Sequence, residues 1–272
     1  MVYLVATTAA SLTARNYAKQ TNINPLLSSL PTNLFVALPL AIAYFLATNS
    51  FVVPDPKFWA FIAVEGTCGV AYGYMSMYAQ KHSDASTYAT LLKSHVLIIL
   101  LVSSIFLGES LSLIQLGGVG ILLLSGLLLS KSIHKTGLRY ILMSIVLLSG
   151  VVIFGRLAVL TSNVGTSILA ANMLGLTLKL GLVGRQIPSS IALLRADFPQ
   201  RVKLSIIVWI QVIAFTLSVD VSGNVGLISS LASVKVVTVM MASYIFLNER
   251  DNLLRKVIAT ILGFTALILL GI

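Results

Sequence analysis

Hydrophobic residues gather into ten runs along the chain, each separated from the next by a short polar break. A helix of about 20 residues crosses the roughly 30 Å hydrocarbon core of a bilayer. Because backbone polar groups in lipid must be satisfied within the segment, such runs are expected to be helices. We therefore predict ten membrane-spanning helices, at residues 2–19, 26–48, 57–79, 84–107, 111–130, 138–160, 165–185, 201–220, 224–247 and 252–272.

The spans and the breaks between them are numbered here in chain order. Only the seventh break is long: it covers residues 187–200, where Pro188 and Pro199 bracket a short amphipathic piece. The other breaks lie at 22–25, 54–57, 81–84, 109–110, 131–137, 162–165, 220–224 and 248–252.

An internal repeat divides the chain into two halves. Residues 91–131 return 140 positions later as 231–271, with twelve identical positions and no gap. The centre of the match is IFLGES at 105–110 against IFLNER at 245–250. The halves, 1–132 and 137–272, then hold five predicted spans each. Because five is odd, the second half enters the membrane in the opposite sense, which predicts an all-α membrane protein of two inverted five-helix repeats.

Composition excludes an ordinary soluble domain. Hydrophobic residues make up 57% of the chain, charged residues only 10%, and the mean hydropathy is +0.99. A single cysteine, Cys68, rules out a disulfide framework, and no Cys/His spacing resembles a metal site. We expect no cofactor and no metal.

The net charge of +10 fits the orientation of a membrane protein better than nucleic-acid binding, and no nucleic-acid partner is expected. Thirteen Lys and Arg residues lie at the odd-numbered breaks and adjoining helix ends. The even-numbered breaks and the termini carry Lys57 alone. The positive-inside rule places the odd breaks in the cytoplasm and both termini outside.

The fourth and ninth spans end in FLGES (106–110) and FLNER (246–250), and a Gly-rich fifth span follows at 116–126. This pattern resembles the EamA-type ten-helix carriers of the drug/metabolite transporter superfamily, which carry an "LGE" signature at that turn. Val96 and Val236 stand where the family often has Pro. Its carriers are also often drawn with both termini in the cytoplasm, opposite to the charge count, so both orientations stay open.

Ionisable groups inside spans mark candidate binding residues, because a charge at a helix centre costs roughly 2.5–3.5 kcal/mol on insertion scales. Lys93 and His95 lie in span four and Lys235 in span nine. His95 and Lys235 are equivalent under the repeat, so an inverted fold would bring them near the bilayer midplane. The functional interpretation is a cationic pocket for an anion or for an amino acid held by its carboxylate. The alternative is that Lys93 and Lys179 reach to the interface, or that Lys235 pairs with Glu65.

Glu65 is the only carboxylate within a predicted span and is a candidate proton-coupling residue; a structural counter-ion is the alternative. Aromatic and amide groups on the same helix faces, or buried in other spans, complete the candidate substrate-binding set: Tyr72, Tyr88, Gln211 and Asn172.

Two further pairs occupy equivalent positions in the halves. Arg15 and Arg156, near the ends of spans one and six, are candidate gate residues, or reach to lipid head groups instead. Glu109 and Glu249 open spans five and ten, where a carboxylate complements a helix N-terminus, so we interpret both as structural.

The sequence therefore favours a secondary transporter, or permease, that moves a small polar metabolite by alternating access. Its partners would be that solute and the lipid bilayer, with a homodimer also possible, and it would be an integral multi-pass protein of the cell (plasma or inner) membrane. Substrate would bind between spans three, four, eight and nine. One alternative is a lipid-linked sugar flippase of the same superfamily; another is a non-transporting scaffold or sensor. An enzyme is not expected, since neither Gly-x-Ser-x-Gly nor HExxH occurs.

Overall fold

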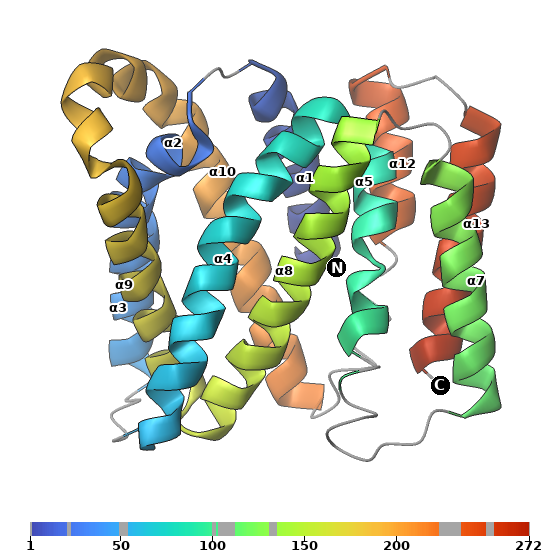
Figure 1. The fold of residues 1–272 in the computed structure, drawn as a ribbon, viewed down its shortest axis with the longest axis horizontal. Coiled ribbons are helices and arrows are strands. Elements are labelled where there is room, and N and C mark those ends of the chain that lie inside the picture. Colours follow the sequence, from blue (N-terminus) through green and yellow to red (C-terminus); the bar gives the residue numbers. More distant parts are fainter. Residues whose placement is uncertain are drawn as a thin grey trace. The chain divides into compact units, whose positions relative to one another are not determined.

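A computed structural model describes residues 2–20, 23–48, 54–99, 102, 112–130, 135–222, 235–248 and 253–271, and this part is helical without any strand. Figure 1 shows the arrangement. The α-helices are α1 (Val2–Gln20), α2 (Pro25–Thr32), α3 (Leu38–Ala47), α4 (Pro56–His82), α5 (Ala85–Leu92), α7 (Leu113–Ser130), α8 (Lys135–Leu160), α9 (Val164–Val183), α10 (Ile187–Ser222), α12 (Lys235–Phe246) and α13 (Leu253–Gly271). A π-helix, η1 (Asn33–Ala37), joins α2 to α3, and a 3₁₀ helix, η2 (Gly184–Gln186), joins α9 to α10.

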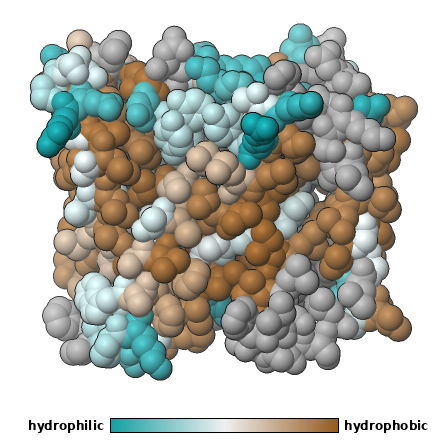
Figure 2. All heavy atoms as spheres, viewed as in Figure 1, coloured by the Kyte–Doolittle hydropathy of each residue, from teal (hydrophilic) through white to brown (hydrophobic). Residues whose placement is uncertain are grey.

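The all-helical fold and its membrane character agree with the sequence. Among the described residues, three helical stretches are long and apolar enough to cross a membrane: Pro25–Ala47, Lys135–Leu160 and Val164–Ala192. Figure 2 shows hydrophobic residues along the middle of α4 and α8, with hydrophilic residues near the ends of these helices. Ten spans in two inverted repeats stay a prediction.

The chain forms two compact units, and neither follows the two sequence halves. Unit 1 consists of Met1–Gln20, Ser76–Ile145 and Ile207–Ile272, and unit 2 of Thr21–Met75 and Val146–Ile206. Each unit therefore draws helices from both halves of the sequence. The long helices α4, α8 and α10 contribute residues to both units.

In unit 1, α7 and α13 pack side by side (Figure 1). Ser125 is fully buried, and its hydroxyl donates a hydrogen bond to the carbonyl oxygen of Ala259, 2.7 Å away. A Cβ atom added at Gly263 would lie only 3.2 Å from that hydroxyl. Small residues thus let the two backbones approach closely, as is common between helices in membranes.

Unit 2 is built around close contacts of α4 with α8 and of α3 with α9. A Cβ atom at Gly150 would come within 2.9 Å of the Cys68 sulfur. Phe58, Ile62 and Ala158 form a buried cluster between α4 and α8. A second apolar cluster joins α2, α9 and α10 through Leu27, Leu30, Leu176, Val183 and Leu194.

The seventh break differs from the prediction. Residues 187–200 are helical and continue through Pro199 into α10. Pro188 stands at the second residue of this helix, where its missing N–H is one that the helix would not use. The amphipathic piece buries Leu194 and exposes Arg195, and this packing outweighs the single backbone bond lost at Pro199.

Span two also departs from a regular helix. The N–H of Leu38 bonds to the carbonyl of Asn33, five residues earlier, which makes η1 a π-turn. Pro39 follows directly and has no N–H of its own to give to the carbonyl four residues before it. The widened turn places Asn33 at an irregularity of the kind that is frequent at functional sites.

Candidate functional site

The helix of predicted span four is interrupted at Lys93 and Ser94. Helix α5 ends at Leu92, and helical geometry resumes at residues 95–99. The N–H groups of Lys93 and Ser94 bond to carbonyls three residues earlier, Thr90 at 3.2 Å and Leu91 at 2.9 Å, which tightens the backbone. No proline is needed for this interruption, although Val96 occupies the position where the related carriers often have one.

The interruption frees a backbone carbonyl that His95 then uses. The N–H of Val96 bonds to the backbone carbonyl of Lys93 at 3.0 Å and not to the carbonyl of Leu92, as it would in a regular α-helix. That carbonyl instead lies 2.8 Å from the Nδ1 atom of His95. The ring is thereby fixed in orientation next to the interruption.

Lys93 is 6% exposed, so the cation belongs to the interior of unit 1 and not to the lipid surface. It continues a polar face of α5 formed by Ser86 and Thr90, which are 2% and 3% exposed. Within the described residues the Ser86 hydroxyl has no hydrogen-bond partner. A buried cation and an unsatisfied hydroxyl on one helix face are the expected features of a polar binding surface.

Apolar packing encloses this segment on several sides. Ala85 and Ala89 pack on Val239 of α12, while Leu97 packs with Leu122 of α7 and Ala266 of α13. Irregular backbone at membrane depth is tolerated where protein surrounds it, as it does here.

The other candidates in unit 1 lie on α5, α10 and α12. Tyr88 is 6% exposed and packs with Leu91 against α8. Gln211 is half-buried in α10. Lys235 is the first residue of α12, but its side chain lies outside the described part of the structure. Three residues further on, Thr238 contacts Thr8 of α1, with 2.7 Å between the two hydroxyls.

A charged network closes one end of unit 1. Arg15, which is 4% exposed, donates to the carbonyl oxygens of Gln80 and, at 3.3 Å, of Lys81 at the end of α4. The Nζ atom of Lys256 lies 2.6 Å from Oδ2 of Asp84, and Nη2 of Arg15 lies 4.0 Å from Oδ1. Asp84 and these two cations thus link α1, the start of α5 and α13. Arg15 also satisfies carbonyls that a helix C-terminus leaves free.

The repeat-equivalent Arg156 has a different environment, because it is exposed on α8 in unit 2. Of these two arginines, therefore, only Arg15 takes part in a buried network.

Glu65 lies half-buried in α4 and faces α8. Its Oε2 atom is buried without a hydrogen-bond partner in the described part of the chain. A Cβ atom at Gly155 would come within 3.0 Å of Oε1, so the glycine makes room for the carboxyl group. Tyr72 is half-buried two turns further along α4. Asn172 donates to the Ile168 carbonyl of its own helix at 2.8 Å.

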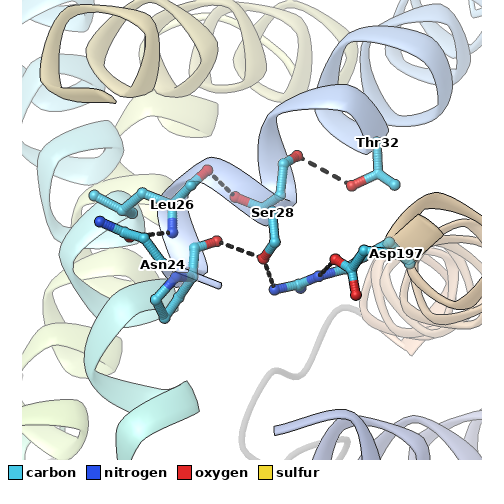
Figure 3. A network of polar contacts seen from close by, with 8 residues as sticks. Asn24, Leu26, Ser28, Thr32 and Asp197 are labelled. Carbon is cyan, nitrogen blue, oxygen red and sulfur yellow. Dashed lines mark hydrogen bonds and ion pairs between the residues drawn. The ribbon is translucent and has the colours of Figure 1, made fainter. Parts of the chain in front are cut away.

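Unit 2 also holds a polar network that links α2 to α10 (Figure 3). Arg201 donates from Nη2 to the hydroxyl of Ser28, and its Nε atom lies 4.0 Å from Oδ2 of Asp197. Ser28 donates in turn to the carbonyl of Pro25 at 3.2 Å. Asn24 caps α2 by accepting from the N–H of Leu26 at 3.0 Å.

Comparison with known proteins bears on the same helices. Residues 1–131 match the EamA-like transporter family. This part of the chain belongs to that family. No curated protein matches the chain. Over this part of the chain, the match confirms the resemblance to the drug/metabolite transporter superfamily, and together with the apolar helices it supports a membrane protein.

The EamA-like region includes the interrupted span four together with Arg15, Glu65 and Asp84. Sequence reasoning did not single out Asp84 or Lys256, because both looked like residues of polar breaks. The signal that could have found them is their position at or beside odd-numbered breaks, which would lie on one side if every predicted span crosses the membrane. Glu109 and Glu249 lie outside the described residues.

Proposed function

We propose that this EamA-like protein is a secondary transporter that moves a small, carboxylate-bearing polar metabolite, an organic anion or an amino acid, by alternating access. The observation that carries the proposal is the interruption of span four at Lys93 and Ser94. A buried cation lies there on the same helix face as the Ser86 hydroxyl, which has no hydrogen-bond partner among the described residues. Transporters bind substrate near the bilayer midplane at discontinuous helices, where unwound backbone and helix ends supply polar contacts.

A ten-span, multi-pass arrangement is supported by the contacts between predicted breaks. Asp84, at break three, pairs with Lys256, beside break nine. At even breaks, the N–H of Asp55 bonds to the carbonyl of Thr161 at 3.3 Å, joining breaks two and six. Odd breaks meet odd and even meet even, as they must if every predicted span crosses the membrane.

In this proposal His95, Lys235 and Lys93 attract the carboxylate, while Tyr88 and Gln211 add hydrogen bonds to the solute. Tyr72 and Asn172 belong to unit 2, and their part in substrate binding stays a prediction from the sequence. Glu65 would carry the coupling proton, because a carboxyl oxygen without a partner is readily held in its neutral form. Arg15 would act as a gate by releasing and re-forming its contacts with α4 and Asp84.

The test is solute uptake into proteoliposomes, after a thermal-shift screen with amino acids, organic acids, sugar phosphates and cationic drugs has found a ligand. Lys93→Met should lower kcat/KM for a carboxylate solute by about tenfold or more, because a hydrogen bond to a charged group is worth roughly 1.5–3 kcal/mol. Lys93→Arg should retain part of the activity.

Lys203→Met is the matched control, since it removes the same charge from an exposed site on α10. Equal flux through the Lys93→Met and wild-type proteins would exclude Lys93 from the binding site. Translocation of a lipid-linked sugar without solute uptake would favour the flippase, and no flux of any kind would favour a scaffold.

A further inference from the structure

A second cationic site lies in unit 2, where α2, η1, α9 and α10 meet. Lys179 of α9 is hydrogen-bonded to the π-turn. With the Asn33 amide oriented to suit both neighbours, its oxygen accepts from the Nζ atom of Lys179 at 3.0 Å, and its nitrogen donates to the carbonyl of Ser29 at 3.0 Å. One turn earlier in α2, Ser28 accepts from Arg201. The π-turn and α2 thus hold two cations in one polar cluster.

The Lys179 ammonium has more donors than the described residues use. An ammonium offers three N–H donors, and among the described residues only Asn33 accepts from it. Lys179 is half-buried, so a ligand from outside the chain can reach its remaining donors. These donors are therefore available to an acceptor that binds here.

The charge of the cluster favours an anion as that acceptor. Lys179 and Arg201 repel each other, and Asp197 lies against Arg201 at 4.0 Å. Two cations and one carboxylate give a formal charge of +1. Unit 2 as a whole contains seven Lys and Arg residues but only three Asp and Glu residues. One added negative charge would neutralise the cluster.

The surroundings indicate what carries that charge. Lys179 stands one turn before the end of α9. Large apolar side chains on η1 and α9 are exposed beside it: Phe35 at 66%, Leu180 at 45% and Leu182 at 63%. An ammonium flanked by exposed apolar groups suits a lipid, whose acyl chains would cover them.

We propose that Lys179 and Arg201 bind the phosphate group of an anionic ligand, and the flanking apolar side chains favour a phospholipid with a singly charged phosphodiester. Lys179 supplies its free N–H donors, and Arg201 supplies charge from the Ser28 side. Asp197 lowers the formal charge of the cluster to +1, which a singly charged anion would neutralise. The site shares no residue with the proposed transport site, so either proposal can fail without the other.

The experiment is thermal unfolding of the full chain in a neutral detergent, with phosphatidylglycerol, phosphatidylcholine or inorganic phosphate added. Phosphatidylglycerol should raise the Tm by at least about 3 °C, more than phosphatidylcholine does, since a bound ligand stabilises the folded state. Lys179→Met should abolish most of this rise, whereas Lys179→Arg and the exposed control Lys203→Met should keep it.

An equal rise in wild type and Lys179→Met, or no rise with any phosphate-bearing additive, would overturn the proposal. A rise with inorganic phosphate but none with phosphatidylglycerol would keep the phosphate site and overturn the lipid as its source. Should Lys179→Met not fold, Asp197→Asn decides: it increases the formal charge to +2 and should enlarge the phosphatidylglycerol shift. A smaller shift in Asp197→Asn would instead show that the cluster is purely structural.

Discussion

The ammonium of Lys256 lies 2.6 Å from the carboxylate of Asp84, and this ion pair fastens the start of α5 to α13. Lys256 is 3% exposed, while the Asp84 side chain is 35% exposed. The carboxylate is also the counter-charge for Arg15, which is itself buried. One acidic side chain therefore compensates two buried cations.

Asp84→Asn should destabilise the protein, because it leaves two buried cations without their counter-charge. Breaking a buried ion pair costs about 3–5 kcal/mol, and the partial exposure of Asp84 lowers the expectation to about 2 kcal/mol. Lys256→Met removes one charge along with its need for a partner and should cost less. A double-mutant cycle by thermal unfolding should give a coupling of about 1 kcal/mol or more; additive effects would mean that the pair contributes nothing.

Gly155→Ala should destabilise the contact of α4 with α8, since its new Cβ atom would meet the Glu65 carboxyl group at 3.0 Å. Crowding of this kind typically costs about 1–3 kcal/mol. Gly181→Ala is the matched control, because nothing lies within 4 Å of a Cβ atom there. In an unobstructed helix the same change should stabilise by about 0.5–1 kcal/mol. Opposite shifts in Tm are expected, and a stabilised Gly155→Ala would contradict the contact.

Glu65→Gln should uncouple transport from protons if Glu65 carries the coupling proton. The amide keeps the shape of the side chain but cannot exchange a proton. Uptake driven by an inward proton gradient should fall to the rate without a gradient, while solute exchange at equal pH should persist. Asp55→Asn, which alters a carboxylate at a break, should stay coupled to the gradient. Gradient-driven uptake by Glu65→Gln would assign the proton to another group.

Asn248 adopts a backbone φ of 55°, in the left-handed region, at the turn after α12. Asn and Gly tolerate this conformation, whereas a β-branched residue does not. Asn248→Gly should therefore leave the Tm nearly unchanged, and Asn248→Val should cost about 1–2 kcal/mol. Equal Tm values for the two variants would argue against the left-handed turn.

The same turn gives a physical reason for one position of the repeated motif in the sequence. FLNER has Asn248 where FLGES has Gly108, and these are the two residue types best suited to a left-handed turn. Gly108 itself lies outside the described residues. Such local chemistry can be recognised from sequence, as can the apolar runs that became helices.

Other features depended on contacts between distant residues and could not be predicted. The interruption at Lys93 and Ser94 has no proline to announce it, and the surrounding packing of α7, α12 and α13 stabilises it. The pairing of Asp84 with Lys256 likewise joins residues from different halves of the sequence. Proline was in turn a misleading signal at Pro199, where the packing of Leu194 keeps α10 continuous.

Because each compact unit takes helices from both halves of the sequence, neither half can fold into such a unit by itself. A chain cut within residues 131–137 yields two fragments, and neither contains all the segments of unit 1 or of unit 2. Until the second half has been synthesised, the helices of the first half lack the packing partners that they have in the two units. Co-expressed fragments would have to associate with each other before either unit could form.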